Sequence, residues 1–346
     1  TRRALIRKWP AVEALGAVTA ICSGKTGTLT ENRLTVTVLD VAGHRLDLAA
    51  RLDSYCPLPG MAEGQPLLLS QPPALSLLLA GGTLCNDAHL EPDPDEPRCF
   101  NAVGDPTEGA LVMAAAREGL WKVELEQSLP RLVQVPFDDR RQRVTTVHRL
   151  PATLSLPVAL EAVWHWSRAM GGLDYVAFTK GRVVSLLEVS SQVWVDGGVK
   201  DLDGNWRNRI SASYHQLAEK GLRVVGVAFR LLPSYPADSW EDLERDLTFI
   251  GLVGMTDPAR PEARDAIATC KAAGIRPIMI TGDHPLTAWH LARELDIAID
   301  HNLLTSEEIK HLSFEELAGA IQEISVYARV SPDQKLRIVQ ALQKQG

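Results

Sequence analysis

The chain has 346 residues, of which 45% are hydrophobic and 23% are charged, and these values are ordinary for a soluble globular protein. Its length predicts two domains, because a single core rarely grows beyond roughly 250–300 residues. The net charge of −7 argues against a bulk electrostatic grip on nucleic acid or on an anionic membrane, although it leaves room for a local basic pocket.

The apolar segments are too interrupted to cross a membrane. The longest runs from residue 67 to 84, and Pro72, Pro73, Gly81 and Gly82 break it, so a buried core helix fits it better than a span of roughly 18–20 residues. The first residues, TRRALIRKWP, lack the apolar region of a signal peptide. The sequence therefore predicts a chain that is soluble by itself.

The five cysteines are scattered along the chain without a C-x-x-C pair. Cys85 and His89 stand four residues apart, but no second pair of ligands completes a zinc site. We therefore expect reduced thiols and no structural zinc.

In chain order, the first predicted element is a strand. Residues 17–22 form a short apolar run that ends at Ser23, which is typical of a parallel strand buried on both faces. The middle of the chain mixes short strands, loops and proline-rich stretches, and it predicts an inserted α+β domain. Its expected helices are residues 73–83 and 108–117, and its expected strands are residues 134–136, 144–147, 175–179 and 223–228.

The last third alternates strands with helices. We expect strands at residues 249–253, 275–280 and 326–330. Helices are predicted to begin at Pro261, Pro285 and Pro332, and Ser313 with Glu316 forms a capping-box pattern before another helix. This order predicts a doubly wound parallel sheet, which the first strand joins across the inserted domain.

The stretch ICSGKTGTLTEN, residues 21–32, has the composition of a phosphate-handling loop. Gly24-Lys25-Thr26 matches the end of the P-loop pattern G-x-x-x-x-G-K-[ST]. The first glycine of that pattern should stand at position 19, which is Thr19, and residues 27–32 do not continue a helix. A P-loop kinase is therefore disfavoured.

Seven further stretches extend the comparison along the chain. They are VGDPTEGALV (103–112), PFDDRRQRVTTV (136–147), TKG (179–181), GLRVVGVA (221–228), GLVGMTDPARPEA (251–263), IMITGDHPLTA (278–288) and YARVSPDQK (327–335). Together with residues 22–32, in this order and spacing, they resemble the cytoplasmic catalytic loop of P-type cation-transporting ATPases. The calcium- and sodium-pump branch is the best match, and the resemblance covers essentially the whole chain.

This resemblance implies a haloacid-dehalogenase-like α/β fold for a phosphorylation domain, residues 1–36 and 249–346, with a nucleotide-binding domain at residues 37–248 inserted into it. It implies ATP and Mg²⁺ as cofactors and an ATP-driven cation pump with an aspartyl-phosphate intermediate. The transmembrane helices and the actuator domain of such a pump are the implied partners, the cation is bound elsewhere, and these domains lie on the cytoplasmic face. The chain stops before the G-D-G-x-N-D motif of the family, so we expect a fragment.

In the phosphorylation domain the family loop reads D-K-T-G-T, and its aspartate is the nucleophile that attacks ATP. Gly24 stands at that position, so the acceptor carboxylate is lost. The resemblance implies that Lys25, Thr281 and Lys335 contact phosphate and that the main-chain carbonyl of Thr26 binds Mg²⁺. Gly282 and Asp283 complete the T-G-D turn near the nucleotide, and Asp257 with Arg260 resembles the hinge that returns from the inserted domain.

In the inserted domain the resemblance places Phe137 on the adenine, Glu108 on the base or ribose side, Lys180 and Gly181 along the pocket, and Arg223 toward the phosphates. The sequence departs from the family twice. Gln142 follows Arg141 where the family has a lysine, and KGRVV (180–184) replaces K-G-A-P-E, which suggests a reshaped pocket. For Arg140, Arg141 and Arg143, a solvated strand face explains the charges as well as phosphate contact does.

The sequence thus predicts a chain that binds ATP without forming a phosphoenzyme. The main alternative is a non-catalytic nucleotide-binding or regulatory module in which Gly24 is native. A soluble phosphatase of the same fold superfamily is disfavoured, because it would need an aspartate at position 24.

Overall fold

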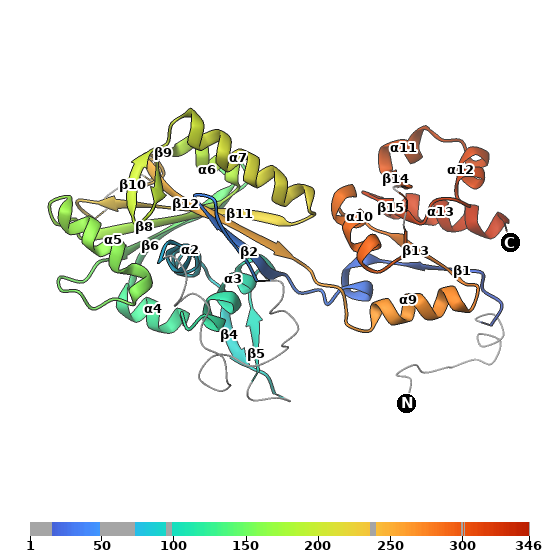
Figure 1. The fold of residues 1–346 in the computed structure, drawn as a ribbon, viewed down its shortest axis with the longest axis horizontal. Coiled ribbons are helices and arrows are strands. Elements are labelled where there is room, and N and C mark those ends of the chain that lie inside the picture. Colours follow the sequence, from blue (N-terminus) through green and yellow to red (C-terminus); the bar gives the residue numbers. More distant parts are fainter. Residues whose placement is uncertain are drawn as a thin grey trace. The chain divides into compact units, whose positions relative to one another are not determined.

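The computed structural model describes residues 16–48, 73–94, 99–235, 240–298, 300 and 302–345. These residues divide into two compact units, whose elements are labelled in Figure 1. Unit 1 holds the described residues of 16–33, 219–221 and 257–345, and unit 2 holds those of 34–218 and 222–256. No helix of the described ranges has both the length and the apolar character that crossing a membrane requires.

Unit 1 is built on a parallel sheet whose four described strands run in the order β1-β13-β15-β14. The strands are Ala20–Ser23 (β1), Arg276–Ile280 (β13), Leu303–Thr305 (β14) and Val326–Ala328 (β15). The helices are Ala263–Ala272 (α9), Pro285–Glu294 (α10), Ser306–His311 (α11), Phe314–Ala320 (α12) and Pro332–Gln345 (α13).

Side chains of the central strands alternate between two cores. Met279, Val326 and Ala328 pack against α9 and α10, whereas Ile278, Ile280 and Tyr327 pack against α11, α12 and α13. Since successive side chains of a strand point to opposite faces, these strands are buried on both sides. The predicted doubly wound parallel sheet is therefore confirmed.

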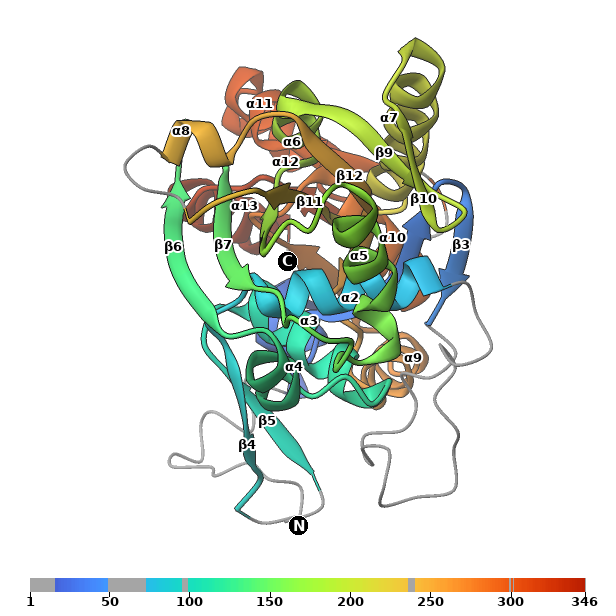
Figure 2. The same ribbon diagram turned by 90° about the vertical axis from the view of Figure 1, so that its left-hand side faces the viewer.

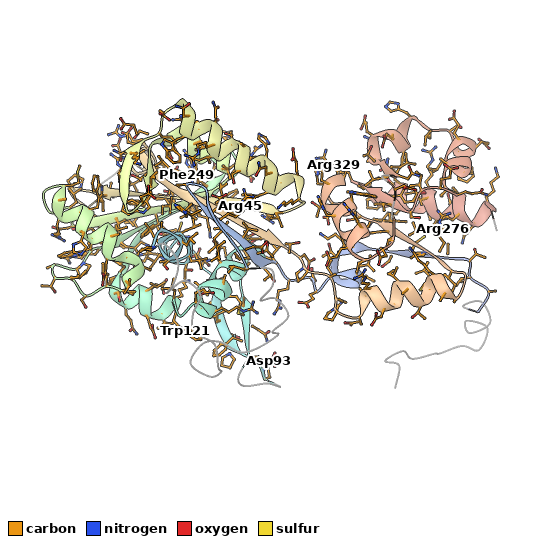
Figure 3. All side chains as sticks on the ribbon, viewed as in Figure 1. Arg45, Asp93, Trp121, Phe249, Arg276 and Arg329 are labelled. Carbon is orange, nitrogen blue, oxygen red and sulfur yellow. The ribbon has the colours of Figure 1, made fainter. Side chains whose placement is uncertain are left out.

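Local signals in unit 1 fix where the helices begin. Ser313 and Glu316 form the predicted capping box at the start of α12, and Thr305 with Glu308 forms a second one at α11. The guanidinium of Arg276 (Figure 3) donates hydrogen bonds to the carbonyls of residues 321, 322 and 324, which fixes the loop that leads into β15.

Unit 2 holds a sheet of nine described strands. The order is β10-β9-β12-β11-β8-β7-β6, with β2 paired to both β12 and β3. The strands are Thr35–Val41 (β2), His44–Asp47 (β3), Arg131–Asp138 (β6), Arg143–Arg149 (β7), Tyr175–Gly181 (β8), Ser190–Val195 (β9), Gly198–Asp201 (β10), Arg223–Leu232 (β11) and Leu247–Thr256 (β12), and a separate hairpin consists of His89–Pro92 (β4) and Phe100–Val103 (β5).

Helices cover both faces of this sheet, as Figure 1 shows. One face carries Pro73–Leu84 (α2), Pro106–Arg117 (α3), Lys122–Ser128 (α4) and Val158–Ala169 (α5), the other carries Val183–Val189 (α6) and Gly204–Glu219 (α7), and the short Trp240–Leu243 (α8) precedes β12. Nearly all of α2 is buried, which confirms the expected core helix for residues 73–84, while residues 67–72 lie outside the described ranges.

Three expectations need correction. The strand predicted at residues 17–22 to be buried on both faces is β1, which lies at the edge of the described parallel sheet with exposed or half-buried side chains. The strand predicted at residues 249–253 does not join the parallel sheet of unit 1, because β12 pairs with β11, β2 and β9 in unit 2. Its continuous burial resembles that of a parallel strand because helices α2 and α6 cover its two faces. Reduced thiols were expected throughout, but Cys99 is disulfide-bonded, since sequence spacing does not tell which loops meet.

Candidate nucleotide and phosphate sites

The loop after β1 has an unstrained backbone at Gly24. Gly24 is extended, with φ −70° and ψ 153°, and a Cβ atom placed on it would meet nothing within 4 Å. Gly27 turns the chain at φ 76°, a left-handed conformation that favours glycine. The loop closes where the backbone N–H of Thr30 donates to the carbonyl of Lys25 at 3.1 Å. The backbone at position 24 therefore does not require glycine.

Lys25 and Asp283 form an ion pair between the loops that follow β1 and β13. The two strands are adjacent and parallel, so their carboxyl ends bring both loops to one edge of the sheet, where open α/β sheets bind ligands. The Lys25 side chain is 10% exposed and that of Asp283 is 34% exposed. Gly24 has no side chain, so Asp283 is the counter-charge of this lysine.

The T-G-D turn is fixed by β15 and by the residues that directly follow it. The backbone N–H of Thr281 donates to Tyr327 at 2.9 Å, and its carbonyl accepts from Val330 at 3.0 Å. The Thr281 side chain is buried and its Oγ1 accepts the backbone N–H of Asp283 at 3.1 Å, whereas Gly282 is exposed. The structure thus brings Lys25, Thr281 and Asp283 together.

Two other predicted residues of unit 1 are not drawn into this cluster. Lys335 is exposed in the first turn of α13, and its side chain makes no hydrogen bond or ion pair within the described ranges. Thr26 is exposed and extended, and its side chain likewise has no hydrogen bond there. Both are free to meet a ligand, but neither is fixed by protein contacts.

Asp257 and Arg260 connect the two segments of unit 1 that flank the insertion. The carboxylate of Asp257 accepts the hydroxyl of Thr30 at 2.6 Å and the backbone N–H of Arg33 at 3.1 Å. Arg260 donates to the carbonyl of Gly27 at 2.9 Å. These contacts give Asp257 a structural position, and they link the hinge directly to the loop after β1.

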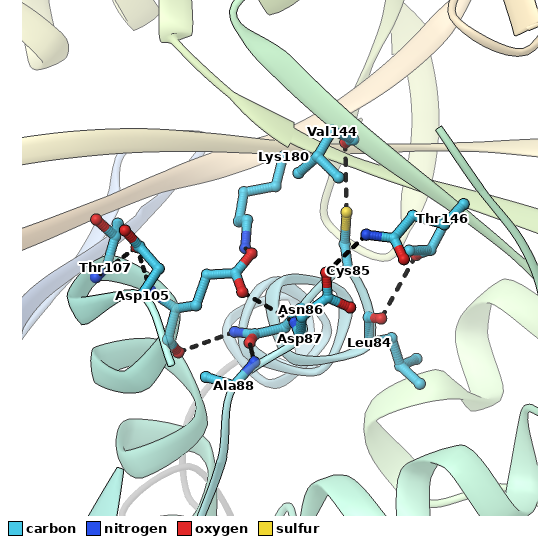
Figure 4. A network of polar contacts seen from close by, with 12 residues as sticks. Leu84, Cys85, Asn86, Asp87, Ala88, Asp105, Thr107, Val144, Thr146 and Lys180 are labelled. Carbon is cyan, nitrogen blue, oxygen red and sulfur yellow. Dashed lines mark hydrogen bonds and ion pairs between the residues drawn. The ribbon is translucent and has the colours of Figure 1, made fainter. Parts of the chain in front are cut away.

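In unit 2, Glu108 and Lys180 are also an ion pair. Figure 4 shows Lys180 in the polar network that also holds Asp87 and Asp105. Lys180 Nζ lies 2.8 Å from Glu108 Oε1, and the backbone N–H of Asp87 donates to Oε2 at 2.9 Å. Asp105 caps α3 and thereby orients Glu108, since its carboxylate accepts the backbone N–H groups of Thr107 and Glu108. The charges of the pair cancel.

Arg131 anchors the segment that holds Glu108. It lies 2.5 Å from Asp87, and Gln134 donates to the other oxygen of Asp87 at 2.7 Å. Although desolvation opposes the effect, the hydrogen bonds from Arg131 and Gln134 lower the pKa of the Asp87 carboxyl. The sequence did not indicate this support, because β6 and the loop after α2 are far apart along the chain.

The side chain of Phe137 is exposed and is therefore accessible to a ligand. The ring is 59% exposed near the end of β6. In the register of the sheet, Asp138 lies opposite Arg143, Arg143 opposite Gly181, and Val144 opposite Lys180. The register shifts between Val135 and Asp138, so Phe137 lies at an irregularity next to the end of β6. Packing in a hydrophobic core does not account for this exposed side chain.

The two arginines Arg141 and Arg143 do not form a solvated strand face. Both contact Glu244, whose side chain is 1% exposed, and Arg143 Nε lies 2.7 Å from its Oε2. Thr145 donates to Glu244 at 2.8 Å, and Arg141 also lies 3.9 Å from Asp138. Figure 2 shows α8, which precedes Glu244, beside the ends of β6 and β7. Sequence alone gave no signal for this pairing across a hundred residues.

The remaining predicted residues of unit 2 lie at the same end of the sheet. A Cβ on Gly181 would stand 2.4 Å from the carbonyl oxygen of Gln142, so the close approach of β7 and β8 requires glycine there. Arg223 begins β11 and is exposed, and its side chain has no hydrogen-bond partner among the described residues. Since β11 runs antiparallel to β8, its beginning lies beside the end of β8.

The donor atoms of unit 1 do not by themselves make a magnesium site. Within the described ranges no three His, Cys, Asp or Glu side chains gather closely enough to hold a metal ion. The Thr26 carbonyl is a suitable oxygen donor, but Mg²⁺ is held through carboxylates together with substrate phosphates, and position 24 supplies no carboxylate. We therefore derive no step through this ion.

Comparison with known proteins identifies relatives that match the whole chain. A family model described as P-type ATPase, cytoplasmic domain N, matches residues 74–262, and one described as haloacid dehalogenase-like hydrolase matches residues 187–346. The chain is 38% identical to the cation-transporting ATPase pma1 of Synechocystis over all of this chain and 36% of that protein. It is 36% identical to calcium-transporting ATPase 1 of Bacillus cereus, over 99% of this chain and 33% of that protein.

A third relative, the calcium-transporting ATPase of Bacillus subtilis, is 34% identical over all of this chain and 36% of its own length. The chain thus spans about a third of the curated relatives that it matches. The fold prediction is confirmed, since the haloacid dehalogenase-like match covers the parallel sheet of unit 1 after β1 and the domain N match covers much of unit 2. The chain belongs to the P-type ATPase family.

Proposed function

We propose that this chain binds ATP through unit 2 and forms no phosphoenzyme at position 24. Two facts taken together support the proposal. Lys25 forms an ion pair with Asp283, and glycine stands at position 24, where the family has its acceptor aspartate. The chain keeps groups that would position a phosphate and lacks the one that would react with it. Phosphoryl transfer depends on both.

Unit 2 supports the nucleotide half of the proposal. Phe137 offers an exposed aromatic face, and an adenine ring can stack on such a face. Glu108 and Lys180 offer a carboxylate and an ammonium group to the base or ribose, and Arg223 offers a cation at the end of the strands. Gly181 allows β7 and β8 to approach closely at this end of the sheet.

Unit 1 supports the phosphate half. The loops with Lys25, Thr281, Gly282 and Asp283 share one edge of the parallel sheet, and Lys335 begins a helix that follows β15. Lys25 and Lys335 would supply positive charge to the γ-phosphate, and Thr281 a hydroxyl. ATP brought here with Mg²⁺ would carry most of the metal's ligands itself, as its phosphates and waters do at other sites.

Neither neighbour of Gly24 replaces the missing carboxylate. The hydroxyl of Ser23 donates to the carbonyl of Gly24 at 3.1 Å. Desolvation raises the pKa of the Cys22 thiol, so that the reactive thiolate is scarce at neutral pH. The wider role follows the family: in a longer protein this part would serve an ATP-driven cation pump, with transmembrane and actuator domains as partners and the cation bound elsewhere.

Incubation with ATP labelled at the γ-phosphate, in the presence of Mg²⁺ and with an acid quench, tests the chemistry. We expect no acid-stable label on the chain with Gly24. Gly24→Asp restores the nucleophile without strain, because a side chain at position 24 has open space, and label on this variant would show that the remaining site is competent.

Gly24→Asn is the matched control, since it has nearly the size of aspartate and no nucleophilic carboxylate. Acid-stable label on the unaltered chain, or on Gly24→Asn, would contradict the proposal. The binding half is tested separately by titration with ATP, which should bind the unaltered chain and bind Phe137→Ala much more weakly.

A non-catalytic module is the second candidate, and the same glycine favours it. In that case Gly24 belongs to the full-length protein, which would bind ATP and transport nothing. Transport by membrane vesicles that contain the full-length protein distinguishes the two, because ATP-dependent cation uptake excludes the module.

A further inference from the structure

Two departures from the family pattern meet in space at the end of β7 and β8. The guanidinium of Arg182 donates from one terminal nitrogen to the side-chain oxygen of Gln142 at 2.9 Å. The backbone N–H of Arg182 also donates to the backbone carbonyl of Gln142 at 2.9 Å. Gln142 is itself fixed, with φ 52° and its N–H donating to the carbonyl of Asp138 at 2.6 Å. The arginine is therefore held by two contacts to one rigid residue.

Three of the other cations near Phe137 have their charges matched. Arg141 and Arg143 share the buried carboxylate of Glu244, and Asp138 lies near Arg141. Lys180 is paired with Glu108. A guanidinium whose partner is a carboxylate has little remaining attraction for a phosphate, since the two charges cancel. These cations can orient a nucleotide, but they contribute little net charge to it.

The positive charge of Arg182 is available to a ligand. Gln142 is a neutral amide, and no carboxylate within the described ranges forms an ion pair with Arg182, which is exposed. One terminal nitrogen is partly used, so the rest of the planar fork of donors stays open, and this fork matches phosphate oxygens. Arg140 and Arg223 are exposed as well, but neither side chain has a hydrogen bond in the described part of the chain, so each would have to be ordered on binding.

We propose that Arg182, held in place by Gln142, binds the phosphates of a nucleotide whose base stacks on Phe137. This inference rests on the proposed nucleotide binding and names the residue that supplies its positive charge. Phe137, Gln142 and Arg182 lie at one end of neighbouring strands, because Asp138, Arg143 and Gly181 form one row across β6, β7 and β8. The residues proposed to contact the base and the phosphates therefore lie at one edge of the sheet of unit 2.

The test compares ATP with adenosine, which lacks phosphates. Both are titrated into the full chain and followed by NMR shifts, which report dissociation constants into the millimolar range. Arg182→Ala should weaken ATP binding by about tenfold, as the loss of a charge-assisted hydrogen bond predicts, and leave adenosine binding unchanged. Gln142→Lys, added to Arg182→Ala, should recover part of the ATP affinity because it returns one positive charge to the same place.

Arg149→Ala is the matched control. Arg149 is an exposed arginine at the other end of β7, opposite Tyr175, so this variant removes the same charge far from the site and should bind ATP as the unaltered chain does. The inference is overturned if Arg182→Ala binds ATP normally, or if it loses adenosine and ATP by the same factor. If the unaltered chain binds neither compound, the proposed function fails first and this inference fails with it.

Discussion

At position 24 the side chain is a single hydrogen atom, while Lys25 next to it keeps an ion pair with Asp283. Motif spacing was sufficient to find both residues, because this loop acts through neighbours in the sequence. It was not sufficient for Glu244, which meets Arg141 and Arg143 only in the folded chain. A carboxylate that neutralises distant cations leaves no periodic or spacing signal, so the sequence left a solvated strand face open for these arginines, and that alternative is wrong.

His148 makes the stability of unit 2 depend on pH. Burial lowers the pKa of this imidazole to about 4, and its two nitrogens contact the carbonyl of Leu129 and the hydroxyl of Thr146, each at 2.9 Å. The unfolded chain, with a pKa near 6.5, binds the proton first. Stability is therefore fully present above about pH 6.5 and falls as the pH drops toward 4, by at most about 3 kcal/mol.

Urea unfolding of unit 2 at a series of pH values measures this effect. His148→Asn can still donate to Leu129 and does not titrate, so its unfolding free energy should depend less on pH between 6.5 and 4. Parallel pH profiles for the two proteins would contradict the assignment to His148.

At the scale of elements, the sequence predicted most helices and strands because their signals are local. Proline and capping-box patterns located the starts of α10, α12 and α13. The assignment of strands to sheets was harder, as β12 demonstrates, because burial on both faces does not reveal the direction of the neighbouring strands. Pairing partners depend on how the chain returns, and that information is not local.

Gly181 tests how closely β7 and β8 must approach. Gly181→Ala would place a Cβ 2.4 Å from the carbonyl oxygen of Gln142 and 2.8 Å from Cα of Arg143, both in the backbone. We expect a loss of about 2–3 kcal/mol in the unfolding free energy of unit 2, together with weaker ATP binding, because the strands must separate where Arg182 is held.

Gly198→Ala is the comparison for this prediction. Gly198 begins β10, and a Cβ there would meet only the carbonyl of Val195 at 3.9 Å, an ordinary contact. Chemical denaturation and ATP titration of both variants measure the effects. Equal stability of the two variants would contradict the close approach.

At the scale of the whole molecule, the two units have separate cores. The clusters around β1, β13 and β15 contain residues of unit 1, and those around the nine-stranded sheet of described strands contain residues of unit 2. The family pattern indicated that one domain is inserted into the other. It did not indicate which side chains inside each core neutralise one another, since that depends on packing.

Separate cores predict separate unfolding. Differential scanning calorimetry of the full chain should show two transitions, and ATP should raise the midpoint of the transition that Gly181→Ala lowers. At an ATP concentration of 100 times its dissociation constant, the stabilisation should be about 2.7 kcal/mol. A single transition that ATP and Gly181→Ala shift as a whole would show that the units unfold together.

The open backbone at Gly24 has an evolutionary consequence. Aspartate and glycine codons can differ by a single base, and the extended conformation leaves open space for a Cβ atom. The loop backbone therefore does not exclude a carboxylate at this position: if the aspartate of the family once stood here, one base change could have replaced it and another could return it without strain in the loop. The identity of position 24 in natural populations would then record whether the proposed reaction is still needed.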